Sequence, residues 1–142
     1  MVKLTKEEQN IIKELEEKFD IDNPPEINQE RFDLIVDKLI EQDKKEVMWN
    51  LCVTYSIQYE GKYNYNKIVD YYIKTKDSYY LEELICFASE ELDHKYIVEE
   101  MLKTEDQTFI KNTLLEYGNA VQYCLNTLEL EKLLDYLKQK RN

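Results

Sequence analysis

The feature that most constrains this chain is an apolar pattern that occurs twice with helical spacing. Residues 68–77 read IVDYYIKTKD, and residues 97–106, which begin 29 positions later, read IVEEMLKTED. In both copies, apolar residues occupy positions i, i+1, i+4 and i+5, an acidic residue occupies i+2, and a Lys-Thr-x-Asp sequence follows. The pattern predicts a helix with one buried face that ends near the Lys-Thr pair, and an aspartate that caps the next helix.

Two further copies of the apolar pattern flank this pair. Residues 35–40 begin 33 positions before the first copy, and residues 120–125 begin 23 positions after the second. Helical units that recur along a chain bury their apolar faces by stacking on their neighbours. Because the spacing is uneven, we expect an all-α fold, a short irregular α-solenoid of stacked antiparallel helical hairpins with about eight or nine helices.

The low glycine and proline content supports a helical fold. The chain has two glycines and two prolines in 142 residues. Strand-rich folds and phosphate-binding loops both depend on glycine-rich turns, so the composition argues against Rossmann and P-loop sites. The adjacent prolines at positions 24 and 25 end the first helix, because proline lacks an amide proton and restricts the residue before it.

We expect one domain over residues 1–142, which is long enough for a substantial core. Residues 1–27 would form an N-terminal capping helix, with a capping box of Thr5 and Glu8, and the proline break. Residues 28–140 would form four hairpins, in which Asp43 caps the second helix of the first hairpin and Gly118-Asn119 ends a later helix. The expected helices span residues 4–19, 28–41, 45–59, 67–74, 78–92, 95–103, 107–117, 119–126 and 128–140.

The start of the chain and its cysteines bear on the expected compartment. No apolar run reaches the roughly 18 residues of a membrane span, and the first residues lack the apolar stretch of a signal peptide. Cys52, Cys86 and Cys124 are an odd number without CxxC spacing, and Cys52 and Cys86 fall on apolar helix faces. We therefore expect buried free thiols and a cytoplasmic location, where thiols stay reduced.

The acidic residues are the first feature that could carry function. The formal net charge is −11, which disfavours binding to nucleic acid. Residues 82–106 contain nine acidic residues and only two lysines. Such a surface can be an ordinary solvated face, or it can attract a basic protein. The candidate partner-binding residues in it are Glu82, Glu83, Glu90, Glu91, Asp93, Glu99 and Glu100.

The tyrosines are the second such feature, since eight of the twelve lie between positions 55 and 80. Tyr59, Tyr63, Tyr65 and Tyr71 fall on expected outer or loop positions. Exposed tyrosines are favoured in protein interfaces, so these four are candidate anchors for a partner. The alternative is a compositional bias toward Lys, Asn, Ile and Tyr that carries no function.

Nothing in the chain forms a recognisable catalytic constellation. His94 is the only histidine, so it has no second histidine for a metal site and no identifiable nucleophile beside it. We expect it to be a surface or cap residue. Adjacent glutamates on a helix point about 100° apart, which does not suit paired acid–base work. We therefore expect no catalytic, metal-binding or cofactor-binding residues, and a protein that is not an enzyme.

The repeated Ile-Val-(Asp/Glu)-x-x-(Ile/Leu)-Lys-Thr-x-Asp blocks resemble those of HEAT-like helical-repeat proteins of low-GC bacteria and their phages. Among these, a small acidic chain resembles the immunity proteins of bacterial toxin systems, with the likeness covering about residues 28–140. The resemblance implies a cytoplasmic protein that binds and neutralises a cognate toxin, often a basic nuclease. Two alternatives are a phage-encoded inhibitor of a defence nuclease, which mimics nucleic acid like an anti-CRISPR, and a helical scaffold or oligomerisation module. In the favoured interpretation the partner is a protein, not a nucleic acid or a membrane.

Overall fold

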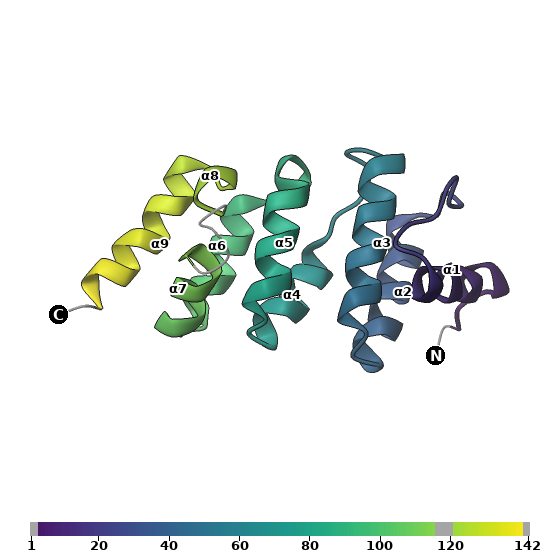
Figure 1. Ribbon diagram of the computed structural model, residues 1–142, viewed down its shortest axis with the longest axis horizontal. Helices are drawn as coiled ribbons and strands as arrows, with labels where there is room; N and C mark the ends of the chain where they lie inside the picture. Colours follow the sequence, from purple (N-terminus) through teal and green to yellow (C-terminus); the bar gives the residue numbers. More distant parts are fainter. Residues whose placement is uncertain (1–2, 116–120, 141–142) are drawn as a thin grey trace. The chain divides into compact units, whose positions relative to one another are not determined.

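The computed structural model describes residues 3–115 and 121–140, and these residues form helices without any strand (Figure 1). The prediction of an all-α fold is confirmed. The chain divides into two compact units, Met1–Ile68 and Val69–Asn142, here called the N-terminal and C-terminal units. The division falls inside helix α4, Asn66–Lys74. The stacking of hairpins into a solenoid and the single domain over residues 1–142 stay predictions.

The N-terminal unit is built from three helices, of which the third packs against the other two (Figure 1). They are α1 (Lys6–Glu17), α2 (Gln29–Glu41) and α3 (Lys45–Gln58). α3 is apolar around much of its circumference because it is covered on two sides, which is the behaviour expected of a central helix. The unit's core therefore gathers around α3.

Glu8 joins the first two helices of this unit. It completes the predicted capping box, in which the Glu8 amide donates to Thr5 Oγ1 (3.1 Å) and the Thr5 amide donates to Glu8 Oε1 (2.8 Å). The same buried carboxylate receives two hydrogen bonds from Arg31 of α2, at 2.7 Å from Nε and 2.5 Å from Nη2. These bonds lower the pKa of Glu8, because a paired guanidinium favours the charged carboxylate.

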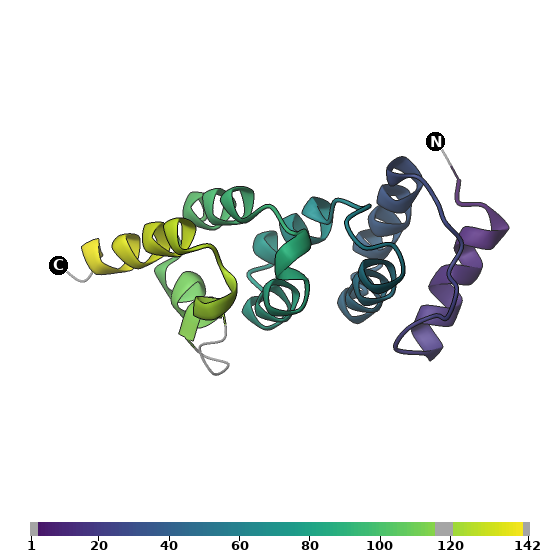
Figure 2. The same cartoon turned by 90° about the horizontal axis from the view of Figure 1, so that it is seen from above.

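The C-terminal unit contains most of the repeated pair of blocks. Several of its helices pack against helices two or three places further along the chain. α5 packs against α7 and α8, α6 packs against α9, and α7 also contacts α8 and α9 (Figure 2). Within this unit the Tyr96 hydroxyl donates to Asp70 Oδ1 (2.5 Å), which links α6 to α4. The elements after α4 are α5 (Ser78–Ala88), the 3₁₀ helix η1 (Ser89–Glu91), α6 (His94–Lys103), α7 (Gln107–Leu115), α8 (Val121–Cys124) and α9 (Thr127–Gln139).

The Lys-Thr-x-Asp sequence forms the same turn in both copies. Asp77 Oδ1 accepts from the Tyr80 amide (3.1 Å), and Asp106 Oδ1 accepts from the Phe109 amide (2.9 Å), so both aspartates are N-caps as predicted. The residue before each aspartate, Lys76 or Glu105, has a positive φ of 54° or 51°. A left-handed residue at this point lets the chain leave one helix and enter the next.

The same turn corrects the prediction that Asp43 caps α3. Asp43 has a φ of 52°, so it occupies the left-handed position that Lys76 and Glu105 occupy in the other two turns. Lys44 stands where those turns have the capping aspartate, and its side chain makes no capping hydrogen bond. The first hairpin thus keeps the turn geometry of the repeat but lacks its capping aspartate.

Most of the predicted apolar positions are buried, with differences near the C-terminal end. The block residues Ile35, Val36, Ile68, Val69, Ile97 and Val98 are all buried. The expected helix over residues 78–92 changes to a 3₁₀ helix at Ser89. In α9 Leu133 is buried but Leu134 is exposed, since a terminal helix is covered on one side only. Predictions for Tyr117, Gly118, Asn119 and Ala120 lie outside the described residues.

Within the same described ranges, no helix combines the length and apolar character needed to cross a bilayer.

Candidate protein-binding face

The outward side of α5 carries aromatic and acidic side chains in one row. Tyr79, Glu83 and Phe87 recur every four residues, so they project from the same side of the helix. The opposite side is buried through Leu81, Leu84, Ile85 and Ala88. Tyr79 and Phe87 are both exposed, Phe87 to 45%. Two exposed aromatic side chains with a carboxylate between them give this side of α5 both apolar contact area and a negative charge.

α8, which packs against α5, carries a further exposed aromatic side chain. Tyr123 is 87% exposed and precedes Cys124, which lies close enough to Cys86 of α5 to raise the pKa of the Cys86 thiol. The Ser89 hydroxyl also donates to the Cys124 carbonyl oxygen at 2.5 Å. These contacts hold the end of α8 against the end of α5. We call the surface formed by Tyr79, Glu83, Phe87 and Tyr123 the α5–α8 face.

His94 supports this arrangement from inside the unit. It is buried, which corrects the expectation of a surface residue, although it does begin α6 directly after its N-cap. Its Nδ1 accepts from the Asn126 amide (2.9 Å) and its Nε2 lies 2.7 Å from the Ser89 carbonyl oxygen, to which it donates. This pattern requires a neutral imidazole with its proton on Nε2. His94 therefore joins η1 to the start of α9 and has a structural role.

Glu82 does not belong to the acidic surface, contrary to the prediction. It is only 5% exposed, and its Oε2 has no hydrogen-bond partner among the described atoms. The position precedes Ile85 by one turn and so lies on the inward side of α5. Burial, and secondarily the charge of Glu83, raise the pKa of Glu82, because both penalise the ionised carboxylate.

The other predicted acidic residues remain at least partly accessible. Asp93 caps α6 through the Tyr96 amide (3.0 Å), and Glu100 pairs with Lys103 (2.6 Å). Glu83, Glu90 and Glu99 form no ion pair within residues 3–115 and 121–140. By accessibility, Glu90, Asp93 and Glu99 are exposed and Glu83, Glu91 and Glu100 are half-buried.

Three of the four predicted tyrosine anchors, Tyr59, Tyr63 and Tyr65, pack within the N-terminal unit instead, and Tyr71 belongs to the C-terminal unit. Tyr63 and Tyr65 are buried, and Tyr59 and Tyr71 are half-buried. The Tyr59 hydroxyl donates to the Pro24 carbonyl oxygen (2.5 Å), and the Tyr63 hydroxyl donates to that of Ile27 (2.5 Å). The connector between α1 and α2 has no helical partners for its carbonyl groups, and the tyrosine hydroxyls supply them. The predicted exposure of Tyr63 is wrong for this reason, and that of Tyr65 is wrong because its ring packs edge-on against Phe32 of α2, with ring centroids 5.8 Å apart.

The aromatic members of the α5–α8 face were not among the predicted site residues. A signal for two of them was present, because Tyr79, Glu83 and Phe87 follow the four-residue spacing of one helix side. Tyr123 offered no such signal, since α8 is only four residues long. Its exposure depends on how α8 packs on α5, which is a long-range contact.

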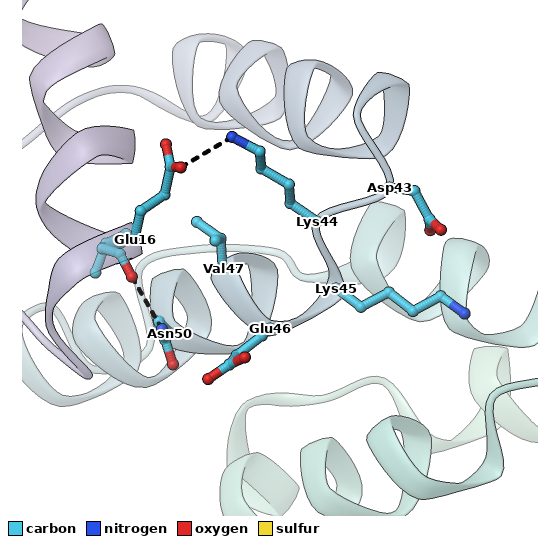
Figure 3. A pocket seen from close by; sticks show the side chains of 8 residues that line it. Glu16, Asp43, Lys44, Lys45, Glu46, Val47 and Asn50 are labelled. Carbon is cyan, nitrogen blue, oxygen red and sulfur yellow. Dashed lines mark hydrogen bonds and ion pairs between the residues drawn. The ribbon is translucent and has the colours of Figure 1, made fainter.

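A depression in the N-terminal unit has a volume of about 450 Å³ and lies beside the start of α3 (Figure 3). Two contacts join polar side chains of its lining to neighbouring groups. Lys44 Nζ lies 3.0 Å from Glu16 Oε2, and Asn50 Nδ2 donates to the Leu15 carbonyl oxygen at 3.0 Å. Among the described residues of the whole chain, no group of three or more histidine, cysteine or acidic side chains could hold a metal ion.

No protein-family model, curated protein or solved structure matches this chain. The resemblance to HEAT-like repeats and to immunity proteins therefore stays a prediction from the sequence.

Proposed function

We propose that this protein is a non-catalytic inhibitor that binds a basic partner protein through the α5–α8 face, in the manner of an immunity protein that neutralises a toxin. The observation that carries the proposal is the exposure of Tyr79 and Phe87 one turn on either side of Glu83, together with the exposure of Tyr123 on the adjoining α8. Aromatic side chains supply rigid apolar contact area, and they are enriched among the residues that dominate binding energy.

The charge around this face selects the class of partner. Glu83 and Glu90 form no ion pair in the described part of the chain, and Glu90 and Asp93 are exposed, whereas Glu82 is buried. A basic protein would supply the missing counter-charges and would be drawn toward the face over about 10 Å at moderate ionic strength. The aromatic side chains would then provide most of the affinity, because exposed charges contribute mainly to association rate.

Inhibition by such a protein needs no chemistry of its own. A partner whose active site is ringed by lysine and arginine, as in a nuclease, would be covered by an acidic and aromatic surface that excludes its substrate. The proposal thus requires a stoichiometric complex in which the partner's activity is lost.

The test is capture of the partner on the tagged full-length protein from native lysate, at low and at high salt. We expect one stoichiometric basic protein whose association is slowed, but not abolished, by salt. The double variant Glu83→Lys/Glu90→Lys should slow association strongly. The matched control Glu14→Lys/Glu17→Lys makes the same change in net charge on exposed positions of α1, and it should have a much smaller effect.

Three results would contradict the proposal. The first is equal slowing by the two double variants, which would mean that only net charge matters. The second is a captured protein that keeps its full activity in the complex. The third is recovery of this chain alone as a salt-insensitive oligomer, which would favour a scaffold. A captured defence nuclease, in place of a toxin, would keep the inhibitor role and change its biological target.

A further inference from the structure

Two of the three cysteines face each other in the C-terminal unit. Cys86 lies near the end of α5 and Cys124 ends α8, and these two helices pack together. Cys124 lies close enough to Cys86 to raise the pKa of its thiol, and both side chains are half-buried. Cys86 is a free thiol as expected, but it is half-buried and not fully buried. Cys52 differs from both, since it is fully buried in α3 of the N-terminal unit.

The backbone around Cys124 is held from two directions. Ser89 follows Cys86 by three residues, and its hydroxyl donates to the Cys124 carbonyl oxygen at 2.5 Å. Two residues after Cys124, the Asn126 amide donates to Nδ1 of the buried His94 (2.9 Å). The proximity of the two thiols therefore follows from fixed backbone contacts and does not depend on side-chain rotation alone.

We propose that Cys86 and Cys124 are a dithiol site that a low-molecular-weight disulfide, of the oxidised glutathione class, converts into an intramolecular disulfide. In the first step one thiolate attacks a sulfur of the oxidant, forms a mixed disulfide and releases one glutathione thiol. In the second step the other protein thiolate attacks the mixed disulfide and releases the second. Two protein thiols lose two electrons and two protons, and the oxidant gains both.

The environment of Cys86 makes this a slow site. Burial, and secondarily the interaction of the neutral Cys86 thiol with Cys124, raises the pKa of Cys86 to about 12. Because the thiolate is the attacking species, exchange at neutral pH is expected to take hours with excess oxidant. In a compartment with a reducing glutathione pool the pair would stay a dithiol, and in an oxidising one it would cross-link α5 to α8.

The site can be tested on the purified, folded full-length protein with oxidised glutathione as the probe. After oxidation, free thiols are blocked with iodoacetamide and the protein is digested with trypsin. The three cysteines fall in separate tryptic peptides, residues 46–62, 77–95 and 112–132. We expect a cross-linked species of the second and third peptides, lighter than their sum by two hydrogen atoms, while Cys52 is found alkylated after denaturation.

Variants and stability complete the test. Cys52→Ala should retain the cross-link, and Cys86→Ser should abolish it. Oxidised protein should melt about 5 °C or more above reduced protein, reversibly with dithiothreitol, and Cys86→Ser should not show this shift. The inference is overturned if Cys86 and Cys124 carry separate glutathione adducts without a cross-link. It is also overturned if only disulfides between two chains form.

Discussion

The hydroxyl of Tyr63 bonds to both backbone groups of Ile27, which lies 36 residues earlier: it donates to the carbonyl oxygen at 2.5 Å and accepts from the amide at 3.2 Å. The ring of Tyr63 also stacks on Phe32 of α2, with ring centroids 4.9 Å apart. One side chain thus closes the connector between α1 and α2 onto the body of the N-terminal unit.

Tyr63→Phe should therefore destabilise the protein by about 1–2 kcal/mol, because it keeps the ring but leaves both backbone groups of Ile27 without their partner. Urea unfolding gives the free energy of unfolding. The control is Tyr123→Phe, which removes a hydroxyl from a side chain that is 87% exposed and should change stability by less than about 0.5 kcal/mol. Equal losses in the two variants would show that the Tyr63–Ile27 bonds do not contribute.

Glu8 provides a prediction with a defined pH dependence. Its hydrogen bonds from Arg31 lower its pKa below the ordinary value of 4.5, so the unfolded chain binds this proton more readily than the native one. The stabilisation that the ionised Glu8 carboxylate contributes is complete above pH 4.5, and it is lost as the pH falls through the lower native pKa of Glu8. Glu8→Gln should cost about 1–2 kcal/mol at neutral pH and progressively less in acid.

The pH series is measured by urea unfolding of Glu8→Gln and of Glu14→Gln, which alters an exposed carboxylate on the same helix. The difference in unfolding free energy between the original protein and the variant should become smaller toward acid for Glu8→Gln only. A gap for Glu8→Gln that stays constant from neutral pH to pH 3 would contradict the assignment of the ion pair with Arg31.

Glu82 should behave in the opposite way. Its pKa is raised, so the native state holds this proton more tightly than the unfolded chain. The residue therefore begins to cost stability as the pH rises above the ordinary value of 4.5, and the cost is complete above its native pKa. Glu82→Gln should stabilise the protein by about 1 kcal/mol at neutral pH, since it removes a charge that is buried with an unpaired oxygen. This gain should disappear in acid, where the native carboxyl is protonated.

Thermal unfolding across a pH series tests this, with Glu99→Gln on an exposed position of α6 as the control. A loss of stability in Glu82→Gln at neutral pH would mean that the carboxylate has a partner that the variant removes.

The turn shared by the three hairpins leads to a prediction at Glu105. This exposed residue has a φ of 51°, which costs a residue with a side chain about 1–2 kcal/mol more than it costs glycine. Glu105→Gly removes this backbone strain, but glycine also loses more conformational freedom when the chain folds. The net effect should be a stabilisation of about 0.5–1 kcal/mol. Glu105→Ala removes the same carboxylate without relieving the backbone, and should not stabilise. Equal thermal midpoints for the two variants would refute this explanation.

Local patterns were sufficient to predict the helices. The apolar positions of the repeated block and the Lys-Thr-x-Asp turn depend on contacts within a few residues, and both are observed in α4 through α7. Asp43 was misassigned because the first hairpin shifts its aspartate by one residue relative to Asp77 and Asp106. That difference is visible in the sequence once the three turns are aligned.

The candidate site was predicted less completely, because its features depend on distant segments. Tyr63 and Tyr65 stand in a polar loop, and only the connector far upstream and Phe32 explain their burial. Glu82 was counted with its acidic neighbours by position along the chain, whereas its angle around α5 puts it among Leu81 and Ile85. Cys86 and Cys124 lie 38 residues apart and meet only through the packing of α8 on α5.

The central claim is that the α5–α8 face binds the partner, and one comparison tests it most directly. Phe87 on α5 and Ile57 on α3 are both exposed, to 45% and 58%, but only Phe87 belongs to the proposed face. The measurement is the dissociation constant of the captured basic protein for Phe87→Ala and for Ile57→Ala. The account predicts at least a roughly tenfold weaker complex for Phe87→Ala and no change for Ile57→Ala. Unchanged binding by Phe87→Ala, or equal weakening by both variants, would contradict it.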